Sequence, residues 1–249
     1  MQFQNIIVKT KSRAVAHNTL RTLRKILNKA VEWEFLPYNP LKGKLPPVPK
    51  NEHSVLTLNQ LIRLVDGLEG EDKCIVALAG FAAFRRGGIF GLRWEDIDFK
   101  ANSINLRRQY SDGLLLDLKT EASRSIVPIW EGLTKILMEW RLQSGSPEWV
   151  FRGKQGNPLS PTAWCRVHWE RIKRDFMLPM DLRFLDLRHT FASILLSEGA
   201  DLGDVQKLMR NSSYQTTIDV YRHLMPGQIE RNFRFFNRGC GEKSRERIS

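Results

Sequence analysis

The sequence predicts a mainly helical domain that holds a small antiparallel β-sheet, which is an α+β fold. Two observations predict it. Apolar residues recur at helical spacing along most of the chain, and three short strand-like stretches stand together in its middle. These stretches are Ser103–Arg107, Leu114–Leu118 and Arg124–Ile129. The turn-forming segments 111–113 and 121–123 separate them, so we expect the three stretches to form one small antiparallel sheet.

Helical patterns flank this middle region on both sides. The first runs from Ser12 to about Phe35, and the second begins after Thr57, which is a suitable N-cap. A third, from about Lys73 to Phe84, is apolar nearly all round and is therefore predicted to be buried. Further helical patterns are expected near residues 131–142, 160–177, 187–198, 202–210 and 214–223.

Five prolines between Pro37 and Pro49 divide the chain, because they are too many for a helix or a central strand. We interpret residues 37–54 as an extended, proline-rich linker. It separates a small helical segment, residues 1–36, from a main domain, residues 55–225, which a basic tail, residues 226–249, follows.

The charge of the chain favours a polyanionic partner. Its 39 lysines and arginines exceed its 27 acidic residues, which gives a formal net charge of +12 and a sequence pI near 9.9. Nucleic acid or an anionic membrane surface would suit that field. No apolar run approaches the roughly 20 residues that span a bilayer, and no signal peptide is recognised. The three cysteines fit a reducing cytosol, and the histidines lack metal-ligand spacing.

Four blocks of sequence resemble the motifs of the tyrosine recombinase, or phage integrase, family. Residues 185–193 read LDLRHTFAS, close to the family's HDLRHTFAS, and residues 206–217 read QKLMRNSSYQTT, close to LGHSSIQTT. Residues 84–97 are similar to a third motif, LRRGELLGLRWEDI, and residues 118–128 to the hairpin that carries the family's catalytic lysine. The blocks stand in the family's order over roughly residues 55–223, which implies the family's catalytic-domain fold.

The resemblance implies a set of catalytic residues for breaking and rejoining DNA. Tyr221 would attack the phosphorus and form a 3′-phosphotyrosyl bond, which stores the energy for religation. Arg85 and Arg188 would grip the non-bridging oxygens with planar, permanently charged guanidinium groups. Lys119 would protonate the leaving 5′-oxygen, and Asn211 would add a weaker contact to the phosphate.

Three positions depart from the family pattern. Leu185 stands where the family has a histidine that handles protons and contacts the phosphate. Asn211 replaces the second histidine, a milder change because an amide can also donate a hydrogen bond. Gly88 replaces the acidic residue that steadies the first arginine. His189 is a candidate substitute for the missing acid–base group, although the family uses this histidine structurally.

A basic face is expected on the helix that covers residues 161–176. Its apolar stripe would consist of Cys165, Trp169, Ile172 and Phe176. Four basic residues lie beside or away from that stripe, and in the family this region faces DNA, so we expect weak DNA contacts. They are Arg166, Arg171, Lys173 and Arg174.

The resemblance to the family leaves three alternatives open. The first is a site-specific recombinase that acts as a homo-oligomer on double-stranded DNA. It would need no metal or nucleotide cofactor, would have no small-molecule substrate or membrane partner, and would work in the cytoplasm, associated with the nucleoid. The second is a catalytically weakened or inactive DNA-binding relic. It is favoured by the departures and by residues 1–36, which resemble only the last helices of the family's core-binding region, as in a truncated or decaying element. The third is an unrelated basic helical DNA-binding protein.

Overall fold

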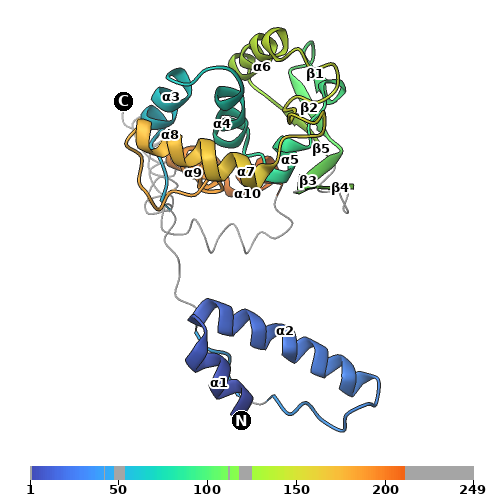
Figure 1. Ribbon diagram of the computed structural model, residues 1–249. Coiled ribbons are helices and arrows are strands. Elements are labelled where there is room, and N and C mark those ends of the chain that lie inside the picture. The colour runs from blue at the N-terminus through green and yellow to red at the C-terminus, as the bar shows by residue number, and fades with distance from the viewer. Residues whose placement is uncertain (1, 42, 48–53, 112, 118–124, 211–249) are drawn as a thin grey trace, which may run out of the picture. The chain divides into compact units, whose positions relative to one another are not determined.

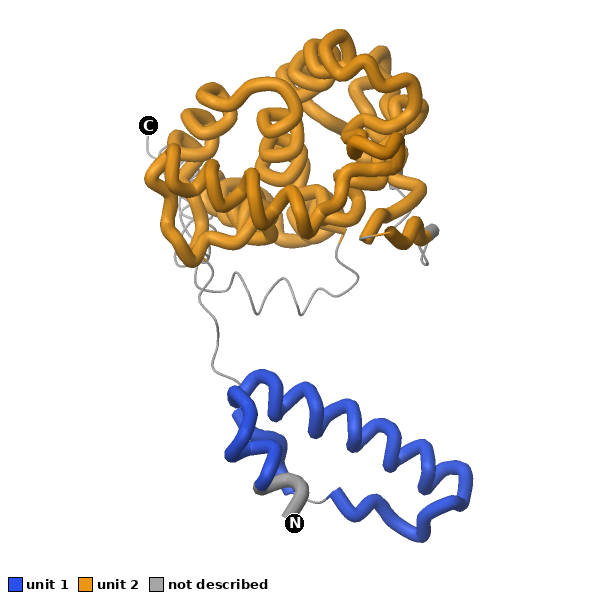
Figure 2. Tube along the Cα trace, in the orientation of Figure 1, with its two compact units in different colours: residues 1–52 blue, residues 53–249 orange. Residues whose placement is uncertain are grey.

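The computed structural model describes residues 2–41, 43–47, 54–111, 113–117 and 125–210 (Figure 1). The chain divides into two compact units, residues 1–52 and residues 53–249 (Figure 2). Among the described residues, no helix is long and apolar enough to cross a membrane.

The first unit consists of two helices and the proline-rich segment. Helix α1 is Gln2–Thr10, which the sequence analysis did not predict, and α2 is Arg13–Glu32. The Ser12 side chain caps α2 by accepting a hydrogen bond from the Val15 N–H. The proline-rich segment lies close to α2, since the Pro46 carbonyl oxygen is 2.8 Å from Nδ1 of His17 in that helix. The described part of the expected linker therefore packs along α2.

Helix α4 forms the centre of the second unit, with α3, α5, α6 and α9 packed against it. It is buried nearly all round, as its sequence predicts. The N-terminus of α3 is closed by a capping box between Thr57 and Gln60. The helices are α3 Leu58–Asp66, α4 Gly70–Ala82, α5 Arg86–Phe90, α6 Glu131–Ser144, α7 Pro161–Trp164, α8 Glu170–Asp175, α9 Asp186–Ser197 and α10 Leu202–Met209.

The strands form two small antiparallel sheets, where the sequence analysis expected one. Strand order is β1-β2-β5 in one sheet and β3-β4 in the other. In the first sheet Ile104 pairs with Val127, and both side chains are buried; in the second, Ser111 pairs with Leu114. Exposed Arg107 separates β2 from β3, so the turn at residues 111–113 joins β3 to β4. The strands are β1 Ile97–Asp98, β2 Ser103–Leu106, β3 Arg108–Ser111, β4 Leu114–Asp117 and β5 Ser125–Pro128.

Two glycines allow α5 to lie directly against β3. A Cβ at Gly91 would come within 3.1 Å of the Tyr110 nitrogen, and one at Gly87 within 3.2 Å of the Tyr110 oxygen. These glycines are four residues apart and so share one face of the helix. The strand is held from its other end by Arg108, whose Nη1 donates to buried Asp96 at 2.6 Å. The position of α5, and of the residue that precedes it, therefore depends on this close approach.

The helix expected over residues 160–177 contains a π-helical turn, Cys165–Trp169. A π turn inserts one extra residue, which rotates everything after it relative to an ideal α-helix. The buried tryptophans are consequently Trp164 and Trp169, five residues apart, and Cys165 is only half-buried. Lys173 is rotated into the interior, where it is 5% exposed. In the expected apolar stripe, Trp169 and Ile172 are buried, and Cys165 and Phe176 are partly buried and pack against the core. The expectation was wrong at Lys173, which does not lie on the solvent face.

Gly80 in α4 provides a test of this packing. A Cβ there would lie 2.6 Å from Cδ1 of fully buried Leu61 in α3. Gly80→Ala improves helix propensity by about 1 kcal/mol, but overpacking costs about 1–3 kcal/mol. We expect a lower free energy of unfolding in urea.

The control is Gly88→Ala in α5, whose Cβ would meet Leu106 Cδ2 at an ordinary 3.6 Å. Its free energy of unfolding should be unchanged or slightly raised. Equal stability of Gly80→Ala and the unsubstituted chain would contradict the close packing of α3 on α4.

Candidate active site

Arg85 projects from the short turn between α4 and α5. Helix α4 ends at Ala83, which adopts the left-handed conformation with φ of 51°. Phe84 follows with its ring buried, and its N–H donates to the Leu78 carbonyl oxygen at 3.1 Å. Arg85 then stands at the N-cap position of α5, and its Nη2 donates to the Arg210 carbonyl oxygen at 3.0 Å.

Arg188 approaches the same place from α9. Its side chain is buried, with 4% exposed, and its two terminal nitrogens donate to the carbonyl oxygens of Ala83 and Met209. Ala83 ends α4, and Met209 is the last residue of α10. The guanidinium group therefore sits at the C-terminal ends of two helices, where the unpaired carbonyl oxygens favour a cation.

The start of α9 is anchored by an ion pair. Asp186, whose side chain is buried, accepts hydrogen bonds from the Arg183 guanidinium at 2.7 Å and from the Arg183 backbone N–H at 2.8 Å. Burial by itself would raise the pKa of the Asp186 carboxyl, but the hydrogen bonds and charge of Arg183 outweigh it, and the pKa is lowered. Asp186 thereby orients the first turn of the helix that carries Arg188.

Arg210 is a third arginine in this cluster, and the sequence analysis did not single it out. It follows α10 in the left-handed conformation, with φ of 53°, and its guanidinium group contacts the carbonyl oxygens of Ala82, Ala83 and Leu208. In the motif LGHSSIQTT this position is a glycine. An arginine at a position that favours glycine was the available signal.

Burial, and at Arg210 also the charge of Arg85, shifts the pKa values in this cluster. Burial lowers the pKa of Arg85. The pKa of Arg210 is lowered to about 10 by burial and then by the charge of Arg85. Within the described residues, Arg85, Arg188 and Arg210 all donate to main-chain carbonyl oxygens. Such a cluster is suited to an anion with several oxygens, such as a phosphate diester.

The family departures Leu185 and Gly88 lie close to these arginines in the sequence and are open to substitution. Leu185 stands one residue before α9, and 48% of it is exposed. A Cβ at Gly88 would meet only Leu106, at an ordinary distance. His189, the expected substitute, is half-buried in α9. The apolar spacing of Leu187, Phe191, Ile194 and Leu195 predicts a core-facing stripe on α9. Leu187 is buried, but the other three are only partly buried, whereas Thr190 and Ala192 are fully buried.

Lys119, Asn211 and Tyr221 lie outside the described residues, as does the tail, residues 226–249. The strands on either side of Lys119 are β4 and β5, which belong to different sheets. Two other tyrosines, which are alternatives to Tyr221 as the nucleophile, lie within the described residues. Tyr110 packs against the hydrophobic core, and Tyr38 is exposed in the first unit.

The four basic residues of the π-containing helix have different surroundings. Arg166 and Arg174 are exposed, and neither forms an ion pair with another described residue. Arg171 binds Asp72 of α4, and buried Lys173 binds Glu170 at 3.0 Å and the Met180 carbonyl oxygen at 2.8 Å. Two of the four therefore present a cation that is not already engaged by a described carboxylate.

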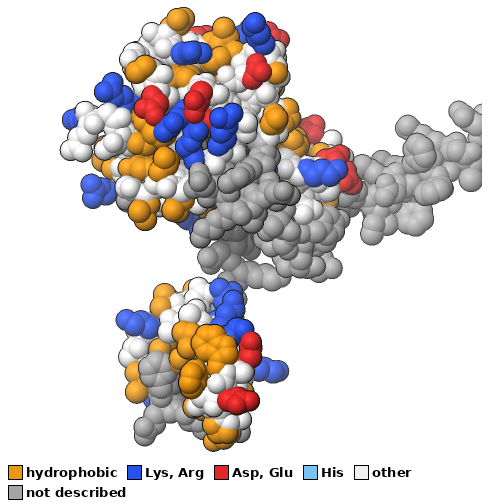
Figure 3. Space-filling model, turned by 90° about the vertical axis from the view of Figure 1, so that its right-hand side faces the viewer, with side chains coloured by type: hydrophobic (Ala, Val, Ile, Leu, Met, Phe, Trp, Pro, Cys, Tyr) orange, Lys and Arg blue, Asp and Glu red, His pale blue; other side chains and the backbone are white. Residues whose placement is uncertain are grey.

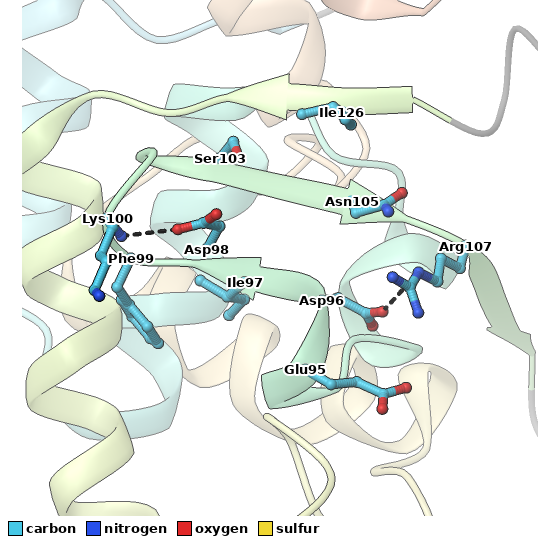
Figure 4. A pocket seen from close by; sticks show the side chains of 10 residues that line it. All are labelled: Glu95, Asp96, Ile97, Asp98, Phe99, Lys100, Ser103, Asn105, Arg107 and Ile126. Atoms are coloured by element: carbon cyan, nitrogen blue, oxygen red, sulfur yellow. Dashed lines mark hydrogen bonds and ion pairs between the residues drawn. The ribbon is translucent and has the colours of Figure 1, made fainter.

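The hollow of about 530 Å³ beside β1 and β2 is not part of the arginine cluster (Figure 4). Its lining carries both charges, with Arg107 Nε 3.8 Å from buried Asp96. On the face drawn in Figure 3, basic and acidic side chains likewise alternate over the second unit. In the part of the chain that the structure describes, no group of three or more histidine, cysteine or acidic side chains is placed to hold a metal ion.

Comparison with known proteins places this geometry in context. The model of the phage integrase family matches residues 54–227. The tyrosine recombinase XerC-like protein of Caldanaerobacter subterraneus subsp. tengcongensis is 26% identical over 267 residues, which cover 92% of this chain and 68% of the relative.

Solved structures share the fold at low sequence identity. The Tn1549 transposon integrase in complex with circular intermediate DNA is 18% identical with a TM-score of 0.77, over 94% of this chain and 84% of that one. A lambda integrase dimer bound to a COC′ core site is also 18% identical, with a TM-score of 0.62, over 86% and 77%. The expected catalytic-domain fold, mainly helical with small antiparallel sheets, is confirmed.

The Asp186–Arg183 pair should make stability depend on pH. Because the folded-state pKa of Asp186 lies below its unfolded value, its contribution is complete above about pH 4. It is lost as the pH falls through the folded-state pKa. At pH 7 we expect Asp186→Asn to lower the free energy of unfolding by about 1–3 kcal/mol, the range for hydrogen bonds to charged groups.

Urea titrations at pH 7 and below pH 4 would measure this effect, and the difference between the two proteins should shrink in acid. Asp204→Asn is the matched control, because Asp204 forms an exposed pair with Lys207 on α10 and should change stability little at either pH. A loss at Asp186→Asn that is independent of pH would contradict the ion-pair explanation.

Proposed function

Because this chain belongs to the phage integrase family, we propose that it is a site-specific DNA recombinase or integrase that cleaves and rejoins DNA strands through a 3′-phosphotyrosine intermediate. The observation that carries the proposal is the convergence of Arg85 and Arg188 on the Ala83–Arg210 region from separate elements. These two residues come from different motifs, 103 positions apart in the sequence, and an unrelated basic protein has no reason to bring them together.

The proposed reaction is a transesterification at phosphorus. The Tyr221 hydroxyl gives its proton to water as its oxygen forms a bond to the phosphorus. The bond to the 5′-oxygen breaks, with Lys119 supplying the proton that makes the leaving group a hydroxyl. Arg85 and Arg188 stabilise the negative charge that develops on the non-bridging oxygens, and Asn211 adds a hydrogen bond. A 5′-hydroxyl of a second strand then attacks the phosphotyrosine, so no external energy source is consumed.

The proposed partner is double-stranded DNA, held by a homo-oligomer because strand exchange joins two duplexes. Arg166 and Arg174 are best placed to contact backbone phosphates. Arg171 would have to leave Asp72 to do so, and Lys173 would have to leave the interior. In the solved lambda integrase complex a dimer binds the core site, which supports an oligomer here. We place the reaction in the cytoplasm, at the nucleoid.

The family match overturns the alternative of an unrelated helical protein. The inactive relic rests on Leu185, Gly88 and Asn211, and the relatives named as recombinases and integrases do not favour it. Loss of one acid–base group slows a reaction by about 10²–10⁴-fold, which leaves an enzyme that is slow and measurable. We therefore propose an active recombinase whose rate is limited at position 185.

A nicked suicide substrate made from the element's own DNA ends tests the reaction. The cleaved fragment diffuses away, so that even a slow enzyme accumulates protein joined covalently to DNA. We expect a covalent product that disappears in Tyr221→Phe, since this change removes only the attacking oxygen. Arg188→Ala should abolish it as well. Product that persists in Tyr221→Phe would assign the nucleophile to another residue.

Position 185 provides a gain-of-function test. Since Leu185 is half exposed, a histidine fits there without a large loss of packing, and we expect Leu185→His to speed covalent-product formation by up to about 10²–10⁴-fold. Leu185→Gln is the control, because it is polar but cannot exchange a proton near neutral pH. Equal acceleration by both substitutions would indicate a solvation effect, and no product from either on DNA that the protein binds would favour the relic.

A further inference from the structure

Arg210 occupies a backbone position that disfavours it. Its φ of 53° lies in the left-handed region, where a Cβ raises the free energy and glycine has no such penalty. The left-handed end of α10 would form equally well with glycine, since the Arg210 N–H that donates to the Gln206 and Lys207 carbonyl oxygens belongs to the main chain. The side chain of Arg210 must therefore supply something that the helix end does not need.

The Arg210 guanidinium group is bound to the turn that carries Arg85. Its Nη2 donates to the Ala83 carbonyl oxygen at 2.8 Å, and its Nη1 to that of Leu208 at 3.1 Å. Its central carbon lies 4.8 Å from the centroid of the Phe84 ring, the residue directly before Arg85. This one side chain thus joins the end of α10 to the last residues of α4 and to Phe84.

Two carbonyl oxygens link all three arginines. The Ala83 oxygen accepts from both Arg188 and Arg210, and the Arg210 oxygen accepts from Arg85. Movement of Arg210 would therefore displace the acceptor of Arg85 and remove a second donor from the carbonyl oxygen that Arg188 binds. The two guanidinium groups are also close enough to interact electrostatically, because the charge of Arg85, after burial, lowers the pKa of Arg210.

We propose that Arg210 is a positioning residue for the phosphate site, which sets the geometry of Arg85 and Arg188 and adds a third positive charge behind them. The inference rests on the proposed function, in which Arg85 and Arg188 hold the scissile phosphate. Arg210 need not touch the phosphate, because its terminal nitrogens are already bound to carbonyl oxygens.

The first test is the rate of covalent-product formation with enzyme in excess over a suicide substrate. Arg210→Gly removes the side chain and suits the left-handed backbone, so the fold should be retained. We expect it to slow cleavage by about tenfold to a hundredfold, the loss typical when reacting groups are displaced by an ångström. Arg210→Lys should lie between, since it keeps the charge but lacks the planar, forked guanidinium group that packs on the Phe84 ring.

Two matched controls distinguish loss of the Arg210 side chain from loss of a positive charge and from relief of a left-handed backbone. Lys207→Ala removes one positive charge from the same helix, and Met177→Gly relieves another left-handed residue, φ 51°, that is 92% exposed. Both should cleave at the unsubstituted rate. Unchanged cleavage by Arg210→Gly, or an equal loss in Lys207→Ala, would overturn the proposal.

A double-substitution cycle tests whether Arg210 acts through Arg85. Residues that act as a unit have strongly non-additive effects on rate. Adding Arg210→Gly to Arg85→Lys should therefore slow cleavage by much less than Arg210→Gly does alone. If the double variant is slowed by the product of the two single-variant factors, Arg210 acts independently of Arg85, and the positioning role would be rejected.

A binding measurement decides the inference even if no cleavage occurs. Inorganic phosphate that binds the folded site raises Tm, whereas its general effect as a stabilising salt is the same in every variant. We expect phosphate to raise the Tm of Arg210→Gly by less than that of Lys207→Ala. An equal rise in both would overturn the role of Arg210. Absence of covalent product with a reduced phosphate effect would contradict the proposed function and leave Arg210 as part of an anion site.

Discussion

The ends of two helices, and the arginines that bind their carbonyl oxygens, are the interaction on which the rest of the site depends. Helices α4 and α10 terminate at Ala82 and Met209 and leave main-chain oxygens without intrahelical partners. Arg188 and Arg210 supply the missing donors. Burying a guanidinium group costs free energy unless the group is paired and hydrogen-bonded. The carbonyl oxygens therefore offset the cost of burying the arginines, and the arginines in turn stabilise the helix ends.

The rest of the fold fixes the positions of these two helix ends and of the arginines that bind them. Helix α4 is buried on all sides and fixes the position of Ala83, while Gly87 and Gly91 allow α5 to approach β3 and so set the direction in which Arg85 leaves. Asp186 and Arg183 fix the start of α9 two residues before Arg188. The site is therefore built on rigid elements, which is what holding a phosphate within a fraction of an ångström requires.

The departures from the family motifs fall into two physical classes. Leu185 is half exposed, and under the proposed function its replacement of the family's histidine bears on proton transfer. Arg210 is structural and electrostatic at once, because its side chain binds the turn before Arg85. Under this proposal, one substitution at a motif position weakens the chemistry of the site, and a second substitution at another motif position strengthens its geometry.

The sequence by itself determined the elements whose signals are local, which are α4 from its continuous apolar character and α3 from the Thr57 cap. The motifs also gave the prediction that Arg85 and Arg188 share one function. What it could not determine depends on contacts between distant segments. The π turn at residues 165–169 has no period of its own, so Lys173 was placed on the wrong face. The division into two sheets follows the break at Arg107 between β2 and β3. The contacts of Arg210 with the Ala82 and Ala83 carbonyl oxygens exist only because α4 and α10 end at the same place.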